Sequence, residues 1–349
     1  MKDLEGLLQY ARMTNCSDLH ISENHNPVFR RNGRLEFETE SYEKNDNRTM
    51  ILRMMNENQK AGLKAGDDQD FVYIDKENNR YRVNVYNQQN QYAAAIRVIY
   101  EEIASLDRLG LPNVLKTLCD QPRGLVLLSG PTGSGKSTTL AAMIDYINEH
   151  FDRHIITIED PVEYVYHQKL SMIHQREVGS DVKSFSTALR SAMREDPDVI
   201  LVGEMRDYET IQAAITAAET GHLVFSTLHT VGAAKTIDRI IDVFPEHKQS
   251  QIRTQLSTVL RAAITQQLIP TIDGMGRVAA CEILLGTDAV SSLIRDNKAH
   301  QLGSIMQTNA KEGMITLNAA LAQLVRAGKI SAVSAAQFSS DPIELRQYL

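Results

Sequence analysis

The sequence lacks the features that would place the chain in a membrane or outside the cell. Its 349 residues contain no apolar run close to the roughly 20 residues that a helix needs to cross a bilayer. The first residues, Met1-Lys2-Asp3-Leu4-Glu5, have neither the basic start nor the apolar core of a secretion signal. We therefore expect a cytoplasmic protein without a transmembrane segment.

Cysteine is also scarce, and the chain has no excess of positive charge. Cys16, Cys119 and Cys281 form no C-x-x-C pair, which excludes a disulfide framework and a cysteine zinc site. The net charge is -7, and we identify no extended aromatic-basic stretch of the kind that binds nucleic acid. This balance disfavours nucleic acid as a partner, although it leaves room for a local basic groove.

The composition present, 42% hydrophobic and 23% charged, is that of a globular protein, and the length suits two domains. Short alternating runs and two helical stretches predict a small α+β domain over residues 1–100. Turn residues and one short helical run predict a linker over residues 101–122. The expected helices of the first domain are 4–11 and 47–61, and its expected strands are 17–21, 27–30, 34–37, 71–74, 80–86 and 93–99.

From residue 123 to residue 349, apolar strands alternate with helical patterns. Nearly continuous apolar strands of this kind predict an α/β domain with a mostly parallel sheet covered by helices on both faces. Beyond about residue 287 the pattern is helical throughout. The expected strands are 124–129, 154–158, 199–202 and 223–228, and the expected helices are 139–147, 183–194, 208–219 and 233–243.

The motif around which the second domain is organised reads G-P-T-G-S-G-K-S-T. It follows an apolar strand and opens a helix, which is the context that a phosphate-binding loop (P-loop) requires. Glycines let backbone N–H groups converge on phosphates, Lys136 can reach the β- and γ-phosphates, and the Ser137 hydroxyl can bind Mg²⁺. The predicted nucleotide site consists of Gly130, Pro131, Thr132, Gly133, Ser134, Gly135, Lys136, Ser137 and Thr138.

Further candidates follow the neighbouring strands, because an open α/β sheet binds its ligands at the carboxyl ends of its strands. The turn Glu159-Asp160-Pro161-Val162-Glu163 brings three carboxylates to this edge. Gly203 stands where many P-loop proteins carry a metal-linked aspartate, so we expect Asp160 or Glu163 to act near Mg²⁺. Glu204 is the candidate general base for the attacking water. A structural ion pair with Arg206 is the alternative for Glu204.

Two histidines flank the strand 223–228. At about 3.3 Å per residue, His222 and His229 are roughly 23 Å apart, so they cannot both contact one γ-phosphate. His229, at the carboxyl end, is the candidate γ-phosphate sensor. For His222 we expect packing or a subunit boundary, and a purely structural role is almost equally favoured.

Three arginines of the first domain form another candidate group. Arg80 and Arg82 share one face of a strand, and Arg97 lies on the next expected strand. Taken singly, each is best interpreted as a solvated surface residue. If the three face a cleft together, they can instead clamp phosphates.

Taken together, these motifs resemble the pilus-retraction (PilT-like) branch of the type II/IV secretion ATPase superfamily. The resemblance runs nearly end to end and implies a PAS-like domain over residues 1–100 and a RecA-like ATPase domain over residues 123–349. It also implies a homo-hexameric ring that binds ATP between the two domains. The segments that carry it are Ser17-Asp18-Leu19-His20, 130–138, 159–163, 190–207 and 219–229.

The resemblance also implies roles for single residues and for the whole molecule. Glu163 becomes the acid of the Asp box, Glu204 the Walker B base, and His222 with His229 the His box. The implied function is a motor that couples ATP hydrolysis, with Mg²⁺, to disassembly and retraction of a type IV pilus. Its implied partners are the pilus base and an inner-membrane platform protein, at the cytoplasmic face of the inner membrane. Arg80, Arg82 and Arg97 fall on the nucleotide side, with Arg97 the firmest match.

The sequence departs from the branch at Ala289-Val290-Ser291-Ser292-Leu293, where Ala-Ile-Arg-Asn-Leu is usual. Ser291 therefore replaces an arginine, on what the resemblance implies is the output side of the motor. Three alternative functions remain: a pilus-assembly or type II secretion ATPase, a RecA-like nucleic-acid motor and a ring that does not hydrolyse ATP. The first is disfavoured because the four-cysteine metal element and the longer N-terminal region of those ATPases are missing.

Overall fold

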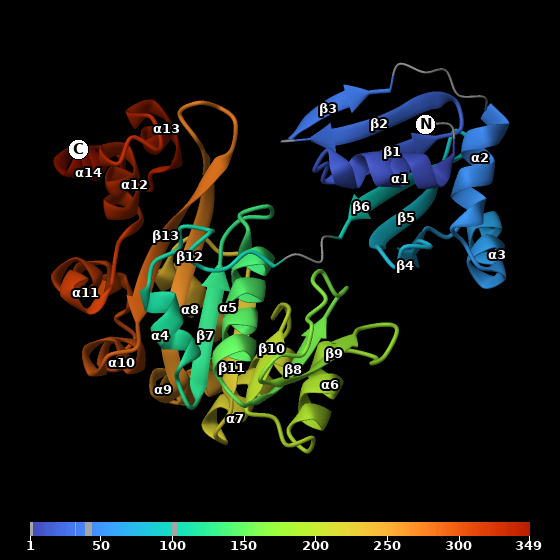
Figure 1. Ribbon diagram of the computed structural model, residues 1–349. Coiled ribbons are helices and arrows are strands. Elements are labelled where there is room, and N and C mark those ends of the chain that lie inside the picture. The colour runs from blue at the N-terminus through green and yellow to red at the C-terminus, as the bar shows by residue number, and fades with distance from the viewer. Residues whose placement is uncertain (1–2, 32, 39–43, 100–102) are drawn as a thin grey trace. The chain divides into compact units, whose positions relative to one another are not determined.

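The computed structural model describes residues 3–31, 33–38, 44–99 and 103–349. The chain divides into two compact units, Met1–Glu102 and Ile103–Leu349 (Figure 1). Each unit is described by itself below.

The N-terminal unit contains an antiparallel sheet of six strands in the order β3-β2-β1-β6-β5-β4. Its helices are α1 (Leu4–Met13), α2 (Lys44–Arg53) and α3 (Glu57–Ala65). The single helix expected over 47–61 is wrong, because Asn56 starts a new helix with a capping box that involves Gln59. The strands are β1 (Asp18–Ser22), β2 (His25–Arg31), β3 (Arg34–Phe37), β4 (Gln69–Ile74), β5 (Arg80–Gln88) and β6 (Gln91–Val98).

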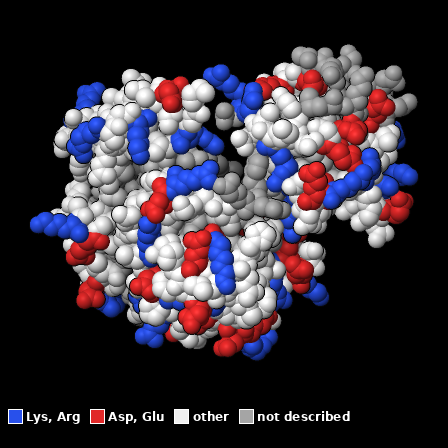
Figure 2. Space-filling model, viewed as in Figure 1, with Lys and Arg blue, Asp and Glu red and all other residues white. Residues whose placement is uncertain are grey.

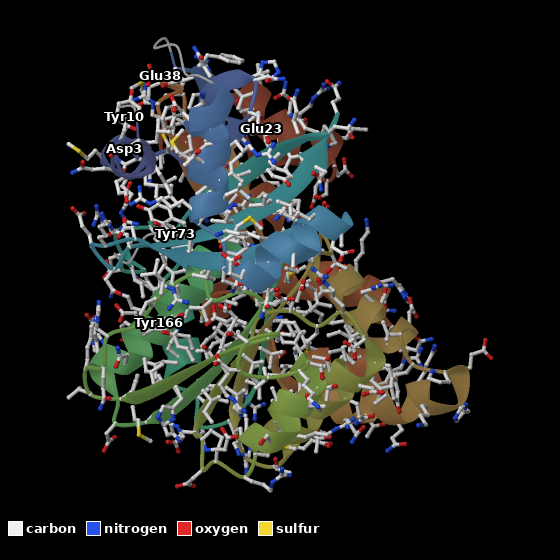
Figure 3. The ribbon with its side chains drawn as sticks, turned by 90° about the vertical axis from the view of Figure 1, so that its right-hand side faces the viewer. Asp3, Tyr10, Glu23, Glu38, Tyr73 and Tyr166 are labelled. Carbon is white, nitrogen blue, oxygen red and sulfur yellow. The ribbon has the colours of Figure 1, made fainter. Side chains whose placement is uncertain are left out.

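Helix α1 shows why this unit packs as it does. The Asp3 side chain accepts a hydrogen bond from the N–H of Gly6 and caps the helix, and the Tyr10 ring meets Phe29 of the sheet edge-on at 4.9 Å. Asp3 and Tyr10 are labelled in Figure 3. The apolar stripe of α1 is buried in the core of the unit, as its spacing predicts. This stripe consists of Leu4, Leu7, Leu8 and Ala11.

The C-terminal unit contains a sheet of seven strands in the order β13-β12-β7-β11-β10-β8-β9. All neighbouring strands are parallel except the antiparallel pair β12 and β13, so the mostly parallel sheet expected from the sequence is confirmed. The strands are β7 (Gly124–Ser129), β8 (His154–Glu159), β9 (Met172–Glu177), β10 (Val199–Val202), β11 (Leu223–Leu228), β12 (Leu260–Pro270) and β13 (Arg277–Leu285).

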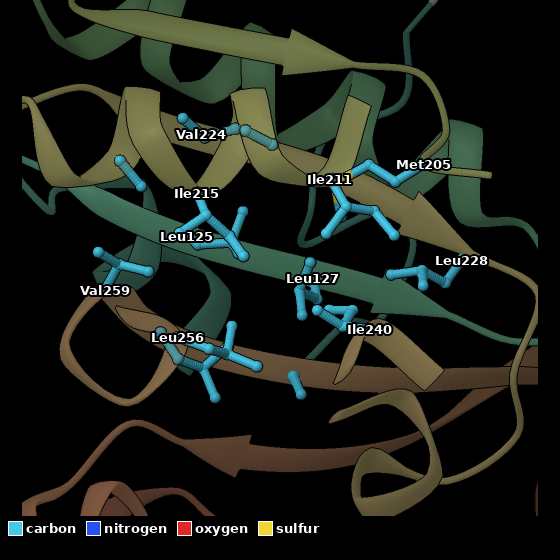
Figure 4. Packing of buried hydrophobic residues seen from close by; sticks show 14 of the residues in the cluster. Leu125, Leu127, Met205, Ile211, Ile215, Val224, Leu228, Ile240, Leu256 and Val259 are labelled. Atoms are coloured by element: carbon cyan, nitrogen blue, oxygen red, sulfur yellow. The ribbon is translucent and has the colours of Figure 1, made fainter. Parts of the chain in front are cut away.

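Helices cover both faces of this sheet, and β7 shows the reason. Leu125 and Leu127 belong to the core on one face, with α7 and α9, whereas Val126 and Leu128 belong to the core on the other face, with α4 and α5. Figure 4 shows the first of these cores. The helices are α4 (Val114–Cys119), α5 (Lys136–His150), α6 (Phe185–Ala192), α7 (Tyr208–Glu219), α8 (Ala233–Asp242) and α9 (Glu246–Val259).

Helical structure follows Gly286 to the end of the chain, as the sequence predicts. Among the described residues, no helix combines the length and the apolar character needed to cross a membrane. On the face drawn in Figure 2, the described acidic and basic side chains are interspersed. The last elements are α10 (Asp288–Arg295), η1 (Ala299–Gln301), α11 (Leu302–Thr308), η2 (Ala310–Glu312), α12 (Leu317–Arg326), α13 (Ala332–Phe338) and α14 (Pro342–Tyr348).

Candidate nucleotide site

The P-loop connects β7 to α5 and depends on glycine at several positions. Gly130, Gly133 and Gly135 have φ values of 142°, 77° and 85°, which side-chain-bearing residues rarely adopt. A Cβ atom on Gly130 would also lie 2.3 Å from the carbonyl oxygen of Gln266 in β12. The glycines therefore allow both the curl of the loop and its close approach to β12.

Lys136 is the first residue of α5, and its side chain folds back over the loop. Its Nζ donates to the carbonyl oxygens of Gly130 at 2.8 Å and Pro131 at 3.0 Å. Burial lowers the pKa of Lys136, while the charges of Glu163 and Glu204 oppose this shift. An ammonium held by neutral carbonyls keeps its charge for an incoming phosphate, so the loop has the chemistry that a nucleotide requires.

Two residues outside the motif support the loop and were not recognised from the sequence. The Tyr164 hydroxyl lies 2.9 Å from Oγ1 of Thr138. The Gln266 side chain is 2% exposed and contacts both Ser134 and Thr139. The adjacent amides Gln266 and Gln267 in β12 were the local signal, because an amide that becomes buried needs partners.

The acidic turn after β8 separates into a buried part and an exposed part. Glu159 is 8% exposed and accepts hydrogen bonds from Thr157 at 2.7 Å and Gln175 at 3.3 Å. Burial raises the pKa of Glu159 to about 7. Asp160 and Glu163 are exposed, so the three carboxylates of the turn do not act as one group.

Glu204 follows β10 and lies between two basic side chains. Its Oε1 lies 2.7 Å from the guanidinium of Arg206, and its Oε2 lies 3.4 Å from Nε2 of His229. The ion pair with Arg206, given above as the alternative, is therefore present. The structure also brings together Glu204 and His229, the two candidates at the carboxyl ends of β10 and β11.

Comparison with known proteins adds to this geometry. A family model described as "Type II/IV secretion system protein" matches residues 1–309. The chain belongs to this family of secretion system proteins. The resemblance inferred from the motifs is thereby confirmed.

Individual members of the secretion family are similar over most of the chain. The chain is 47% identical over 341 residues to "Type IV pilus retractation ATPase PilT" of Pseudomonas aeruginosa. This alignment covers 97% of this chain and 99% of that protein. It is 52% identical over 282 residues to "Twitching motility protein" of Neisseria gonorrhoeae, covering 81% of this chain and 75% of that protein. A solved structure, "Crystal Structure of the Pilus Retraction Motor PilT and Bound ADP", matches with a TM-score of 0.91 and 45% identity over 99% of both chains.

The second histidine of the His box lies at the other end of β11. His222 precedes this strand, and its Nδ1 lies 2.9 Å from the carbonyl oxygen of Ala217 and 3.3 Å from Oγ1 of Thr220. These contacts tie His222 to the end of α7. His222 and His229 thus flank β11, and the structure does not bring His222 to the P-loop edge.

The three candidate arginines of this secretion-family chain lie in the N-terminal unit. Arg82 and Arg97 are direct cross-strand neighbours, and Arg80 shares the face of Arg82. Arg82 forms an ion pair with Asp70 at 2.7 Å, and Arg97 forms one with Asp18 at 3.0 Å. The predicted common face is therefore present within the N-terminal unit.

The expected metal ligands do not form a ready-made cation site. Within the described ranges, no three His, Cys, Asp or Glu side chains gather so that they could hold a metal ion. Ser137 is exposed in the first turn of α5, and Asp160 is exposed after β8. Both oxygen groups suit Mg²⁺, which commonly binds through few protein ligands together with substrate phosphates.

Proposed function

We propose that this chain is an ATPase whose hydrolysis cycle drives retraction of a type IV pilus. The observation that carries the proposal is the 47% identity to a retraction ATPase over 97% of this chain and 99% of that protein. The P-loop supports it chemically, since its backbone and Lys136 have the form that binds nucleotide phosphates.

In this proposal, residues at the carboxyl ends of different strands have different roles in ATP hydrolysis. The P-loop amides and Lys136 bind the phosphates, and Ser137 and Asp160 would hold Mg²⁺, which would neutralise phosphate charge. Arg206 and His229 hold the carboxylate of Glu204 at the end of β10. From there Glu204 takes the proton of the attacking water, His229 senses the γ-phosphate, and Glu163 acts near Mg²⁺ as the acid of the Asp box.

The proposal extends to an assembly. Six copies form a ring at the cytoplasmic face of the inner membrane and act on the pilus base through a platform protein. Arg80, Arg82 and Arg97 of the N-terminal unit supply positive charge to bound ATP, and His222 serves a subunit boundary. The likeness of the chain to PilT over its whole length supports this extension.

The chemical half of the proposal is tested with purified protein. Lys136→Ala should weaken ATP binding, because it removes the cation that grips the phosphates. Glu204→Gln should bind ATP almost normally and lose turnover, because an amide cannot take the proton of water. Normal steady-state hydrolysis by Glu204→Gln protein would contradict the assignment of the base.

The biological half is tested by counting surface pili with and without the protein. Loss of a retraction motor should raise the number of pili, whereas loss of an assembly ATPase should abolish them. Stimulation of the ATPase by single-stranded DNA would instead favour a nucleic-acid motor, since only that function needs a nucleic-acid site.

A further inference from the structure

A single buried amide joins three segments around the P-loop. Gln266 of β12 lies 132 residues beyond Ser134, and its Nε2 donates to the carbonyl oxygen of Ser134 at 2.8 Å. Its Oε1 accepts from the hydroxyl of Thr139 in α5 at 2.8 Å. The amide therefore uses its donor on the loop and its acceptor on the helix that follows.

The backbone of the same strand touches the start of the loop. The carbonyl oxygen of Gln266 occupies the space that a side chain on Gly130 would need. The neighbouring Thr265 hydroxyl lies 2.8 Å from Oγ of Ser129, the last residue of β7. Strand β12 thus contacts the loop where it begins, in its middle and where α5 starts.

The bond to Ser134 has a directional consequence. In a trans peptide the C=O and the following N–H point in opposite directions. When Gln266 holds the carbonyl of Ser134 toward β12, the N–H of Gly135 is aimed to the other side of the loop. A P-loop binds phosphate through such N–H groups, so their direction sets the affinity.

We infer that Gln266 is a positioning residue for the phosphates of the bound nucleotide. It does not touch the phosphates but fixes the peptide units of the P-loop that do. This inference rests on the proposed function, because it concerns the same nucleotide site.

The test replaces the amide by an apolar side chain of similar length, Gln266→Met. This change leaves the carbonyl of Ser134 and the hydroxyl of Thr139 without their partner in a buried place. We expect the Kd for ADP with Mg²⁺, measured by titration calorimetry, to rise about tenfold, which corresponds to about 1.4 kcal/mol. The KM for ATP should rise by a similar factor, while kcat falls much less.

The matched control is Asn318→Ala in α12. Asn318 is also a buried amide, 1% exposed, and it donates to the carbonyl of Asp341 outside the nucleotide site. It should lower thermal stability without changing the Kd for ADP. An unchanged Kd in Gln266→Met protein, or an equal loss of affinity in Asn318→Ala protein, would overturn the inference.

A second variant keeps the test decisive if Gln266→Met does not fold. Gln266→Glu retains an acceptor for Thr139 but, when ionised, has no donor for Ser134; a protonated carboxyl regains one. Its affinity for ADP, relative to the native protein, should therefore recover as the pH is lowered. A ratio that stays low at every pH would contradict the inference. Native protein that binds ADP but does not hydrolyse ATP would contradict the proposed function alone.

Discussion

Glu159 carries a proton that depends on the fold. Burial raises its pKa from 4.5 to about 7, although hydrogen bonds from Thr157, Gln175 and the N–H of Glu163 oppose the shift. At a pH between these two pKa values, Glu159 is protonated in the folded protein and ionised in the unfolded chain. The contribution of Glu159 to the free energy of unfolding is therefore greatest at acid pH and falls as the pH rises to about 7.

We expect Glu159→Gln to remove this dependence, because a glutamine stays neutral at every pH. The difference in the free energy of unfolding, variant minus native protein, should increase from pH 4 to pH 8 by on the order of 3 kcal/mol. Urea unfolding of both proteins at the two pH values measures the change. A difference between the two proteins that is the same at pH 4 and pH 8 would show that folding leaves the pKa of Glu159 unchanged.

The P-loop needs glycine for two reasons, its positive φ angles and its close approach to β12, and Gly130 and Gly133 differ in the second. Both have positive φ, but a Cβ on Gly130 would meet the backbone of β12, whereas nothing lies within 4 Å of a Cβ on Gly133. We expect Gly130→Ala to abolish ADP binding, because the loop must leave β12. Gly133→Ala carries only the strain of its left-handed backbone, about 1–2 kcal/mol. Calorimetric titration with ADP compares them, and equal losses would contradict the role of β12.

Helices α9 and α10 meet at the position where the sequence departs from the pilus-retraction branch. Oγ of Ser291 donates to the carbonyl oxygen of Ser257 in the last turn of α9 at 2.6 Å. An arginine at this position would place a cation at the carboxyl end of α9, where the helix dipole favours positive charge.

We therefore expect Ser291→Arg to fold and to keep ATP turnover within a small factor, while retraction frequency or force changes. None of the candidate catalytic residues lies on α9 or α10, which is the reason for this separation. The paired measurement is turnover of purified protein and retraction of labelled pili in cells. A parallel change in both would place the effect on the ATPase itself.

Local patterns predicted the elements whose signals are local. Strand β7, the P-loop and α5 follow from one continuous motif, and α1 follows from its apolar spacing. Strands β9, β12 and β13 were not predicted. β9 carries polar residues at an edge of the sheet, and β12 follows directly on α9 without a turn signal between them.

The site divides in the same way. Lys136 and Glu204 are identified by their place in a motif. The contacts of Gln266 join residues more than 100 positions apart, and the burial of Glu159 depends on packing across β8 and β9. The spacing of residues along the sequence does not predict these long-range contacts or this burial.

Arg97 raises a question at the scale of the whole molecule, because it lies in one unit and the P-loop in the other. If closure of the domains brings this cation to bound ATP, Arg97→Ala should slow hydrolysis. A fragment of residues 103–349 should then hydrolyse ATP more slowly than the full chain. Steady-state turnover measures both.

The control is Arg31→Ala, which removes another arginine of the same unit that is paired with an acid, Glu36, at 2.8 Å. It should leave turnover unchanged. A fragment as active as the full chain would show that the N-terminal unit contributes nothing to the chemistry.

The place of β12 between β7 and β13 also affects how the protein is made. On the ribosome, β7, the P-loop and α5 emerge more than 100 residues before β12. Until Leu260–Pro270 arrives, one edge of the mostly apolar β7 lacks its neighbour, and such an edge invites pairing with other chains. A chain interrupted before residue 260 contains the complete nucleotide motif but an open sheet. The nucleotide site is thus completed late in synthesis, although its defining motif is made early.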